Sequence, residues 1–599
     1  MFTLLKRPAV SRKPLPLGLR AITLAAALGF AVVPALAGGQ AERLWPAPTR
    51  DWKPVQPGEH PRLFFRKTDL SDLKKRAETP DGKQILARLK VLLGGGEAMP
   101  TVYNQSKKAY EGKLKRAPLG TYTLWHGPGF GLLYQLTGEK KYADLGRQCV
   151  EKAFAGQVDR DDRYSWTAPG GALRAGPSLA AIAMAYDLCH DGWEPEFRQK
   201  VAVAIQNYEG NPKDTATSLA RMALKPKHHP GSNHWGPQVG GAGLAVLAIK
   251  GDPGTDDGLL GKYLEGVEKN AVRAVTQGFG DRGFFAEYQG PGQINSDTAL
   301  VPFFQAMKIA GGKDYISSRP NVPWITLLRV MEMIPRGDKP YYALRHPSSY
   351  GTEFFQREGL SRGGQFAQGF GTVTEEQKPA LLWVYNHFVE PNPKERTFDT
   401  VSPYPHRAVL AFVNWPLTLP EKNPVEVLPR VVEDKVFGYY LFRNRWKDAN
   451  DILVSAYLLH GPRPYKAYNS EPVLVWGLGI QATLGQFTKS ETTAFERRPD
   501  GSGAVSSKDT FLVVDYSGKS GAAAVVILTG QGASRVKVTE KRGANGATAR
   551  TTTVVAGGQT FAVLTLQTGA APEVRSEGKR VLVGPQSFRF DGKKITAGQ

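Results

Sequence analysis

The sequence predicts a multidomain α+β protein, with a region of stacked helical hairpins followed by an antiparallel β-sandwich. The first part repeats an apolar helix end, a glycine turn and a new helix start, as in the segment from Leu132 to Tyr142. Such units recur at irregular spacing of roughly fifty residues, which is typical of stacked helical pairs. After the Pro-rich segment 420–429, short β-type runs such as 511–514 and 524–528 alternate with Gly, Asn and Asp turns.

The helical units differ in composition between their two partners. Inner segments such as 182–188 and 244–249 are small and apolar, whereas the following segments 194–203 and 259–267 carry Lys, Glu and Arg. Helices with apolar residues on all sides are buried, and amphipathic helices cover them. We therefore expect an inner and an outer helix in each hairpin.

The N-terminal residues have the pattern of a secretory signal. Basic residues precede the apolar run 21–33, and Ala35-Leu36-Ala37 fits a small-x-small cleavage site. We expect residues 1–37 to be a signal peptide, with export to the periplasm or outside the cell; an uncleaved membrane anchor is the alternative. No later segment is long and apolar enough to span a bilayer, so no stable membrane insertion is expected after cleavage.

The remaining boundaries follow from composition. Residues 38–58 are rich in Pro and Gly and form an irregular lead-in; the helical domain covers 59–419 and the β-sandwich domain 430–599. Cys149 and Cys189 are the only cysteines, and either one disulfide or two buried thiols fits them. Neither possibility provides a Cys-based metal site.

The net charge favours an acidic partner. The formal charge is +22, and removal of the five basic residues before position 37 lowers it to +17. An exported protein rarely works on nucleic acid, so we expect an anionic polysaccharide or oligosaccharide as partner, with no nucleic acid; simple solubility is the alternative. The sequence leaves the oligomeric state open.

One stretch of the helical region concentrates histidine. The segment Lys227–Gly236, here called the His234 loop, contains His228, His229 and His234 and leads into the small apolar run 240–249. A polar loop that enters a buried helix is well placed for chemistry, because rigid elements position loop residues. A satisfied cluster of polar core side chains fits the same pattern.

Four motifs in this order resemble the heparinase II/III-like group of polysaccharide lyases. They are His60-Pro61-Arg62-Leu63-Phe64-Phe65, Asn233-His234 before a Gly-rich helix, Asp281 to Tyr288, and Phe442-Arg443-Asn444-Arg445-Trp446. The resemblance implies an incomplete (α/α) toroid as the catalytic domain. It also implies a lyase that cleaves a uronic-acid-containing polysaccharide by β-elimination.

Two features depart from this group. Its members often carry a Tyr shortly after a Glu-Gly-Pro-Gly element, which here is Gln289 to Gly292 followed by Gln293; Tyr288 can substitute in a different register. The His and Asp cluster that many members carry in the β domain is also missing, because His460 is the only histidine after residue 406. We therefore expect no metal and no cofactor, although His228, His229 and His234 could still converge on one.

β-Elimination at a uronate needs three functions: neutralisation of the carboxylate, a base for the C5 proton and an acid for the leaving oxygen. Following the resemblance, we expect Asn233 to donate hydrogen bonds to the carboxylate. His234 can neutralise the carboxylate or act as the base, and Tyr288 can be base or acid.

Further residues are candidates for substrate binding. Aromatic side chains in Gly/Pro-rich loops can stack on sugar rings, His346 can be the second histidine, and Glu287 can be a base or bind water. The full set is Trp125, His126, Trp166, His229, Glu287, Gln289, Arg345, His346 and Tyr350. Ordinary aromatic core packing is the alternative for Trp125, His126 and Trp166, and it is the favoured interpretation for Trp166.

Two other functions fit the same chain. One is a glycoside hydrolase that uses paired carboxylates such as Glu287 and Asp281. The other is a glycan-binding protein that kept the fold without activity, because fold does not determine function. A lyase forms a double bond that absorbs in the ultraviolet, a hydrolase forms only new reducing ends, and a binding protein forms neither.

Overall fold

The computed structural model describes residues 45–102, 117–317, 319, 321–336, 339–343, 365–458, 470–488, 490–530, 533, 539–591 and 595–598. The described residues belong to one compact unit. The predicted signal peptide lies outside the described residues. The predicted site residues Arg345, His346 and Tyr350 also lie outside them.

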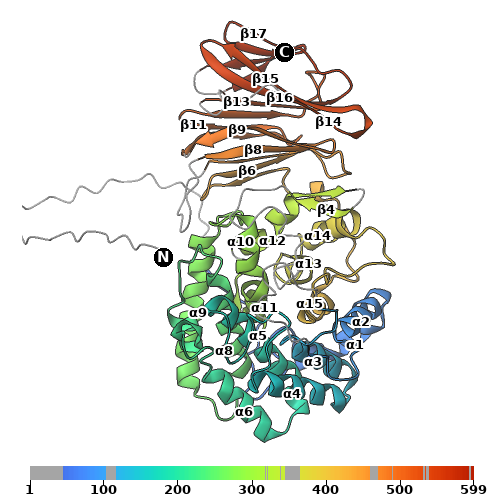
Figure 1. Ribbon diagram of the computed structural model, residues 1–599, viewed down its shortest axis with the longest axis vertical. Coiled ribbons are helices and arrows are strands. Elements are labelled where there is room, and N and C mark those ends of the chain that lie inside the picture. The colour runs from blue at the N-terminus through green and yellow to red at the C-terminus, as the bar shows by residue number, and fades with distance from the viewer. Residues whose placement is uncertain are drawn as a thin grey trace, which may run out of the picture. The chain divides into compact units, whose positions relative to one another are not determined.

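Helices fill the first part of the described chain, and antiparallel sheets fill the second, which confirms the predicted fold class (Figure 1). The helices are α1 (Leu70–Glu78), α2 (Pro80–Leu92), α3 (His126–Thr137), α4 (Lys140–Phe154), α5 (Ala172–Cys189), α6 (Pro195–Gln206), α7 (Leu219–Leu224), α8 (Trp235–Ile249), α9 (Asp257–Arg273), α10 (Gln289–Asn295), α11 (Val301–Ile309), α12 (Asn321–Met331), α13 (Gln365–Gly369), α14 (Lys378–Val384) and α15 (His406–Asn414).

The expected division into inner and outer helices is present. Every residue of α8 is buried, whereas α9 buries only one face. Glycines let the inner helices approach closely: a Cβ on Gly241 would lie 2.3 Å from the carbonyl oxygen of Gly176 in α5. The small residues that marked 240–249 as an inner helix therefore serve backbone-to-backbone packing.

The inner helices pack in sequence, and the last one returns to the first. α3 contacts α5, α5 contacts α8, and α8 contacts α11 and the π-helical turn Ser296–Leu300. α15 packs against α2 and α3. Trp125 before α3 stacks on His406 at the start of α15, so the N-termini of these two helices lie together.

The β region consists of three stacked antiparallel sheets. The first has the order β5 (Val431–Asp434), β6 (Tyr439–Arg443), β7 (Leu453–Tyr457), β8 (Ser470–Gly477) and β9 (Ile480–Thr488). The second has the order β10 (Thr492–Arg497), β11 (Gly503–Ser507), β12 (Phe511–Asp515), β13 (Ala524–Thr529), β16 (Gln559–Thr568), β15 (Ala547–Ala556) and β14 (Thr539–Arg542). The third has the order β17 (Val574–Glu577), β18 (Arg580–Val583), β19 (Gln586–Phe590) and β20 (Ile595–Gly598).

Side-chain alternation explains why the middle sheet is covered on both faces. In β12, Leu512 and Val514 join the core shared with the first sheet. Phe511 and Val513 point the other way and join the core shared with the third sheet. Because successive side chains alternate between faces, a fully apolar strand must be buried on both sides. The third sheet is an addition to the predicted sandwich.

The first sheet also packs against the helical region. Tyr439, Leu441 and Tyr457 belong to the same core as the helices, and the Tyr439 hydroxyl donates a 2.6 Å hydrogen bond to Glu332 Oε1. The guanidinium of Arg443 donates to the carbonyl oxygen of Met333 at 2.8 Å. Buried polar contacts of this kind join the two regions at defined positions.

Two further expectations can be compared with the described residues. Cys149 and Cys189 are both free and buried, so the thiol alternative holds. Within the described part of the chain, no helix has the length and apolar character that crossing a bilayer requires.

Candidate active site

The His234 loop is held by one buried glutamine. Gln238, in the first turn of α8, accepts the backbone N–H of Lys227 at 2.9 Å and donates to the carbonyl oxygens of Lys227 and His234 at 3.1 and 2.5 Å. These bonds close the loop onto the start of α8. The side chains of Asn233 and His234 are therefore carried by a rigid helix terminus.

The structure brings two of the predicted elements together. The backbone N–H of Asn233 donates to Glu287 Oε2 at 2.8 Å, and Asn295 Nδ2 donates to the carbonyl oxygen of Ser232 at 2.8 Å. Asn233 is buried and His234 is half-buried. The Asn-His element and the segment that contains Glu287 and Tyr288 are thus joined by a hydrogen bond, although fifty-odd residues separate them in the chain.

Burial and basic residues nearby determine the protonation of His234. Its ring lies 4.5 Å from the ring of His228. Burial, followed by the charges of His228, Arg174 and Lys227, lowers the pKa of His234 to about 4. At neutral pH the imidazole is therefore neutral and has a lone pair that can accept a proton.

Arg174, which the sequence analysis missed, is a candidate because its charge is among the causes that lower the pKa of His234. It lies in the first turn of α5, and its buried Nε has no hydrogen-bond partner among the described residues. A cation at a helix N-terminus is electrostatically unfavourable, so its position there needs another reason. The sequence contained a sign of this, because Arg174 is the only basic residue in the mostly apolar segment 172–189.

Glu287 and Tyr288 occupy the turn before α10. Burial raises the pKa of Glu287, while the hydrogen bond from the Asn233 N–H lowers it in part. Tyr288 is 9% exposed and has a φ of 71°, an uncommon backbone conformation for a bulky residue. Gln289 is the first residue of α10.

The predicted aromatic residues lie in packed surroundings. Trp125 is 1% exposed and stacks on His406 at 3.9 Å between ring centroids. His126 is buried, and its Nδ1 accepts the backbone N–H of Thr123; burial lowers the pKa of His126 to about 3. Trp166 packs against Phe154 and Tyr208 at 4.9 and 4.5 Å. Their roles in sugar binding remain predictions.

His229 separates from the other two histidines of the loop. It is exposed, its Nδ1 accepts the backbone N–H of Gly231 at 3.0 Å, and burial with the charge of Arg273 lowers its pKa. His228 and His234 lie side by side without it. Within the described residues, the three histidines do not form a group of metal ligands.

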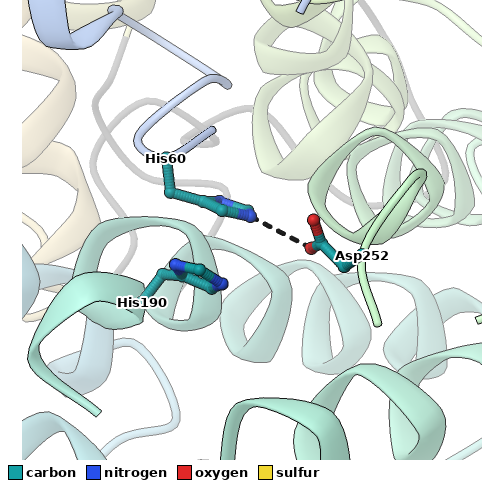
Figure 2. Close-up of side chains that lie close together, drawn as sticks. All are labelled: His60, His190 and Asp252. Atoms are coloured by element: carbon teal, nitrogen blue, oxygen red, sulfur yellow. Dashed lines mark hydrogen bonds and ion pairs between the residues drawn. The ribbon is translucent and has the colours of Figure 1, made fainter. Parts of the chain in front are cut away.

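A different cluster has the composition of a metal site. His60, His190 and Asp252 have ligand atoms within 4.8 Å of one another, and all three are buried (Figure 2). His60 Nδ1 lies 2.8 Å from Asp187 Oδ1, and His60 Nε2 lies 3.0 Å from Asp252 Oδ2. Together with Arg62 these residues are called the His60 network below.

The chain supplies its own cation to the His60 network. The guanidinium of Arg62 contacts both His60 Nε2 and Asp252 Oδ1. The His60 and His190 rings are stacked at 3.9 Å and 25°, so their in-plane lone pairs do not converge on one point (Figure 2). The arrangement therefore fits a buried ion network better than a metal centre.

A cavity of about 880 Å³ lies away from these residues, among α1, α11 and α15. None of the predicted site residues that the structure describes lines it. Its lysines Lys75, Lys308 and Lys378 are each paired with a carboxylate. The fourth cation of its lining, Arg76, donates to the carbonyl oxygens of Phe412 and Trp415 instead.

In comparisons with known proteins, matches were found only among solved structures. No protein-family model matches the chain, and no curated protein matches it. Among solved structures, the chain is similar to heparan sulfate lyase HepC from Pedobacter heparinus, with 12% identity, a TM-score of 0.43, and coverage of 89% of this chain and 94% of that chain. It is also similar to a heparinase III, with 10% identity, a TM-score of 0.42, and coverage of 89% and 99%.

A third match is the chondroitin AC lyase of Streptomyces coelicolor A3 in complex with chondroitin sulphate. Its identity is 9% and its TM-score 0.36, with coverage of 84% of this chain and 82% of that chain. The resemblance predicted from the motifs is thus found again among solved structures. At these identities and TM-scores, no residue role is transferred from them to this chain.

Proposed function

We propose that the protein is an exported polysaccharide lyase that cleaves a uronic-acid-containing polysaccharide by β-elimination. The observation that carries the proposal is the joining of the His234 loop to Glu287 and Tyr288 through the 2.8 Å hydrogen bond from Asn233 N–H to Glu287. One site then offers an amide, a neutral imidazole and a phenol. These groups match the three functions that the elimination needs.

The substrate carboxylate is neutralised by Asn233 and Arg174. The Asn233 amide can donate hydrogen bonds to it, and the Arg174 guanidinium supplies the positive charge that a neutral His234 lacks. Stabilising this carboxylate lowers the energy of the carbanion that forms at C5, because the negative charge spreads onto the carboxyl oxygens. The segment 1–37 and the basic net charge support an anionic substrate outside the cytoplasm.

His234 takes the C5 proton, and Tyr288 gives a proton to the leaving oxygen. The electron pair of the C5–H bond forms the C4–C5 double bond while the bond from C4 to the leaving oxygen breaks. A neutral imidazole is in the correct state to accept a proton, which the lowered pKa of His234 supports. A tyrosine hydroxyl ordinarily keeps its proton at neutral pH and can act as the acid.

The hydrolase alternative has weaker support. Asp281 accepts the backbone N–H of Lys435 at 2.9 Å, and Glu287 accepts the backbone N–H of Asn233. Both carboxylates are thus held by backbone groups of different segments. A paired acid and base would instead need to face one another across the scissile bond.

The direct test incubates purified protein with alginate, heparan sulfate and chondroitin sulfate. Ultraviolet absorbance of the new double bond and reducing ends are followed in the same samples. The proposal expects both signals to rise together on at least one polyuronate. Reducing ends without absorbance would favour a hydrolase, and binding without either signal would favour a glycan-binding protein.

A further inference from the structure

The turn before Tyr288 is fastened to the β region by one buried carboxylate. Asp434, the last residue of β5, is fully buried. Its Oδ2 accepts the backbone N–H groups of Arg282 and Phe284 at 3.0 and 3.2 Å, and its Oδ1 accepts the N–H of Phe437 at 3.2 Å. A side chain from one region thus satisfies the backbone donors of a loop in the other.

Hydrogen bonds run in both directions between this loop and the end of β5. Asp281 Oδ1 accepts the backbone N–H of Lys435 at 2.9 Å, so the loop and the end of β5 exchange hydrogen bonds. Gly280 leaves room for this approach, because a Cβ there would lie 2.0 Å from Asp434 Oδ1. The contact therefore depends on a residue without a side chain at position 280.

Aromatic packing continues the contact toward Tyr288. The Phe284 ring stacks on Tyr439 at 4.4 Å and lies 4.7 Å from Tyr457. The Tyr288 ring meets Tyr457 edge-on at 5.5 Å. Since Tyr288 also holds an uncommon positive φ, its orientation depends on how the preceding turn is held.

We propose that Asp434 is a positioning residue of the active site, which holds the 281–284 turn so that Glu287 and Tyr288 face Asn233 and His234. The inference rests on the proposed function for the role of Tyr288. It assigns to the β region a part in the reaction, through a residue that does not touch the substrate.

The buried position of the Asp434 carboxylate is energetically unfavourable. Burial, followed by the charge of Asp281, raises the pKa of Asp434, and the three N–H donors only partly oppose this rise. A buried acid beside a second acid reduces stability unless its hydrogen bonds compensate. A costly polar group at a loop that leads to an active site is expected when the loop must be held in one position.

Asp434→Asn tests the inference because it keeps the shape and replaces one accepting oxygen with a donor. Loss of the loop position is expected to lower kcat by about 10- to 100-fold, as for displacements of about 1 Å, while KM changes little. Hydrogen exchange of the peptide 281–288 is expected to speed up, and that of α8 to stay unchanged. Asp515→Asn in β12 is the matched control, since Asp515 is also buried and accepts a backbone N–H, that of Ser517.

Each outcome decides the inference. Unchanged exchange in 281–288, or faster exchange with an unchanged kcat, would overturn it. If Asp434→Asn unfolds, the half-buried Asp281→Asn variant replaces it, with the same effects expected at smaller size. If the wild-type protein turns over no polyuronate, the proposed function fails, and the exchange result alone decides whether Asp434 holds the loop.

Discussion

The helical region contains two clusters of histidine whose surroundings are opposite. In the His60 network, the ring nitrogens of His60 lie next to the carboxylates of Asp187 and Asp252. Arg62 also contacts the ring, and the whole group is buried. In the His234 loop, the ring of His234 is half-buried and its charged neighbours are cations. This difference indicates that the reactivity of a histidine cannot be inferred from the residue type alone. It depends on the charge of the neighbouring groups and on exposure.

The comparison predicts the largest effect on turnover at the His234 loop. His234→Ala and Tyr288→Phe are each expected to lower kcat by about 10²- to 10⁴-fold, because each removes a proton-transfer group. Thermal unfolding is expected to stay near that of the wild type. His387→Ala in the π-helical turn Tyr385–Val389 is the control for activity, since this ring is exposed and belongs to no predicted site. Near-full activity in both variants would remove the loop from the mechanism.

In the His60 network, a substitution is expected to lower stability and to leave turnover unchanged. His60→Ala leaves Asp187 and Asp252 buried with one partner fewer, so the free energy of unfolding should fall by about 3–5 kcal/mol. Chemical denaturation measures this change, and kcat of the remaining folded protein should be close to that of the wild type. A stable His60→Ala protein with lost activity would mean that the His60 network, and not the His234 loop, takes part in the reaction.

Arg174→Gln tests whether the guanidinium of Arg174 binds the substrate. It removes the charge proposed to bind the substrate carboxylate, so KM should rise by roughly 10- to 100-fold, the size of one charge-assisted hydrogen bond. Arg221→Gln on the exposed surface of α7 is the control. Equal KM values in the two variants would contradict a binding role for Arg174.

The smallest effect is expected from metal removal. Because Arg62 supplies the cation of the His60 network, chelation followed by dialysis should change neither the melting temperature nor the rate. Both quantities are measured with and without added zinc. A drop in melting temperature that only zinc reverses would show that the network binds metal.

Much of the fold could be predicted from the sequence because its signals are local. Glycine and alanine in 240–249 mark a closely packed inner helix, and the apolar runs 511–514 and 524–528 mark strands. The third sheet was missed, because strands such as β17 carry charged, exposed residues and lack a clear apolar alternation.

The site was predictable in part. The Asn233-His234 motif was visible in the sequence, but the pKa of His234 depends first on burial and then on charges that include Arg174, sixty residues earlier. The same holds for Asp434, whose partners Arg282 and Phe284 come from another region. Such contacts are set by tertiary packing, so a single sequence carries little trace of them.

The protonation of His234 tests the central claim most directly. Because its pKa is lowered to about 4, the ring should stay neutral through the neutral range and take up a proton only as the pH falls through about 4. Ring NMR signals of labelled histidine, assigned by their loss in His234→Asn, follow this titration without substrate. The account predicts a midpoint near pH 4, shifted upward in Arg174→Gln. A midpoint near the ordinary histidine value of about 6.5, unmoved by that change, would contradict it.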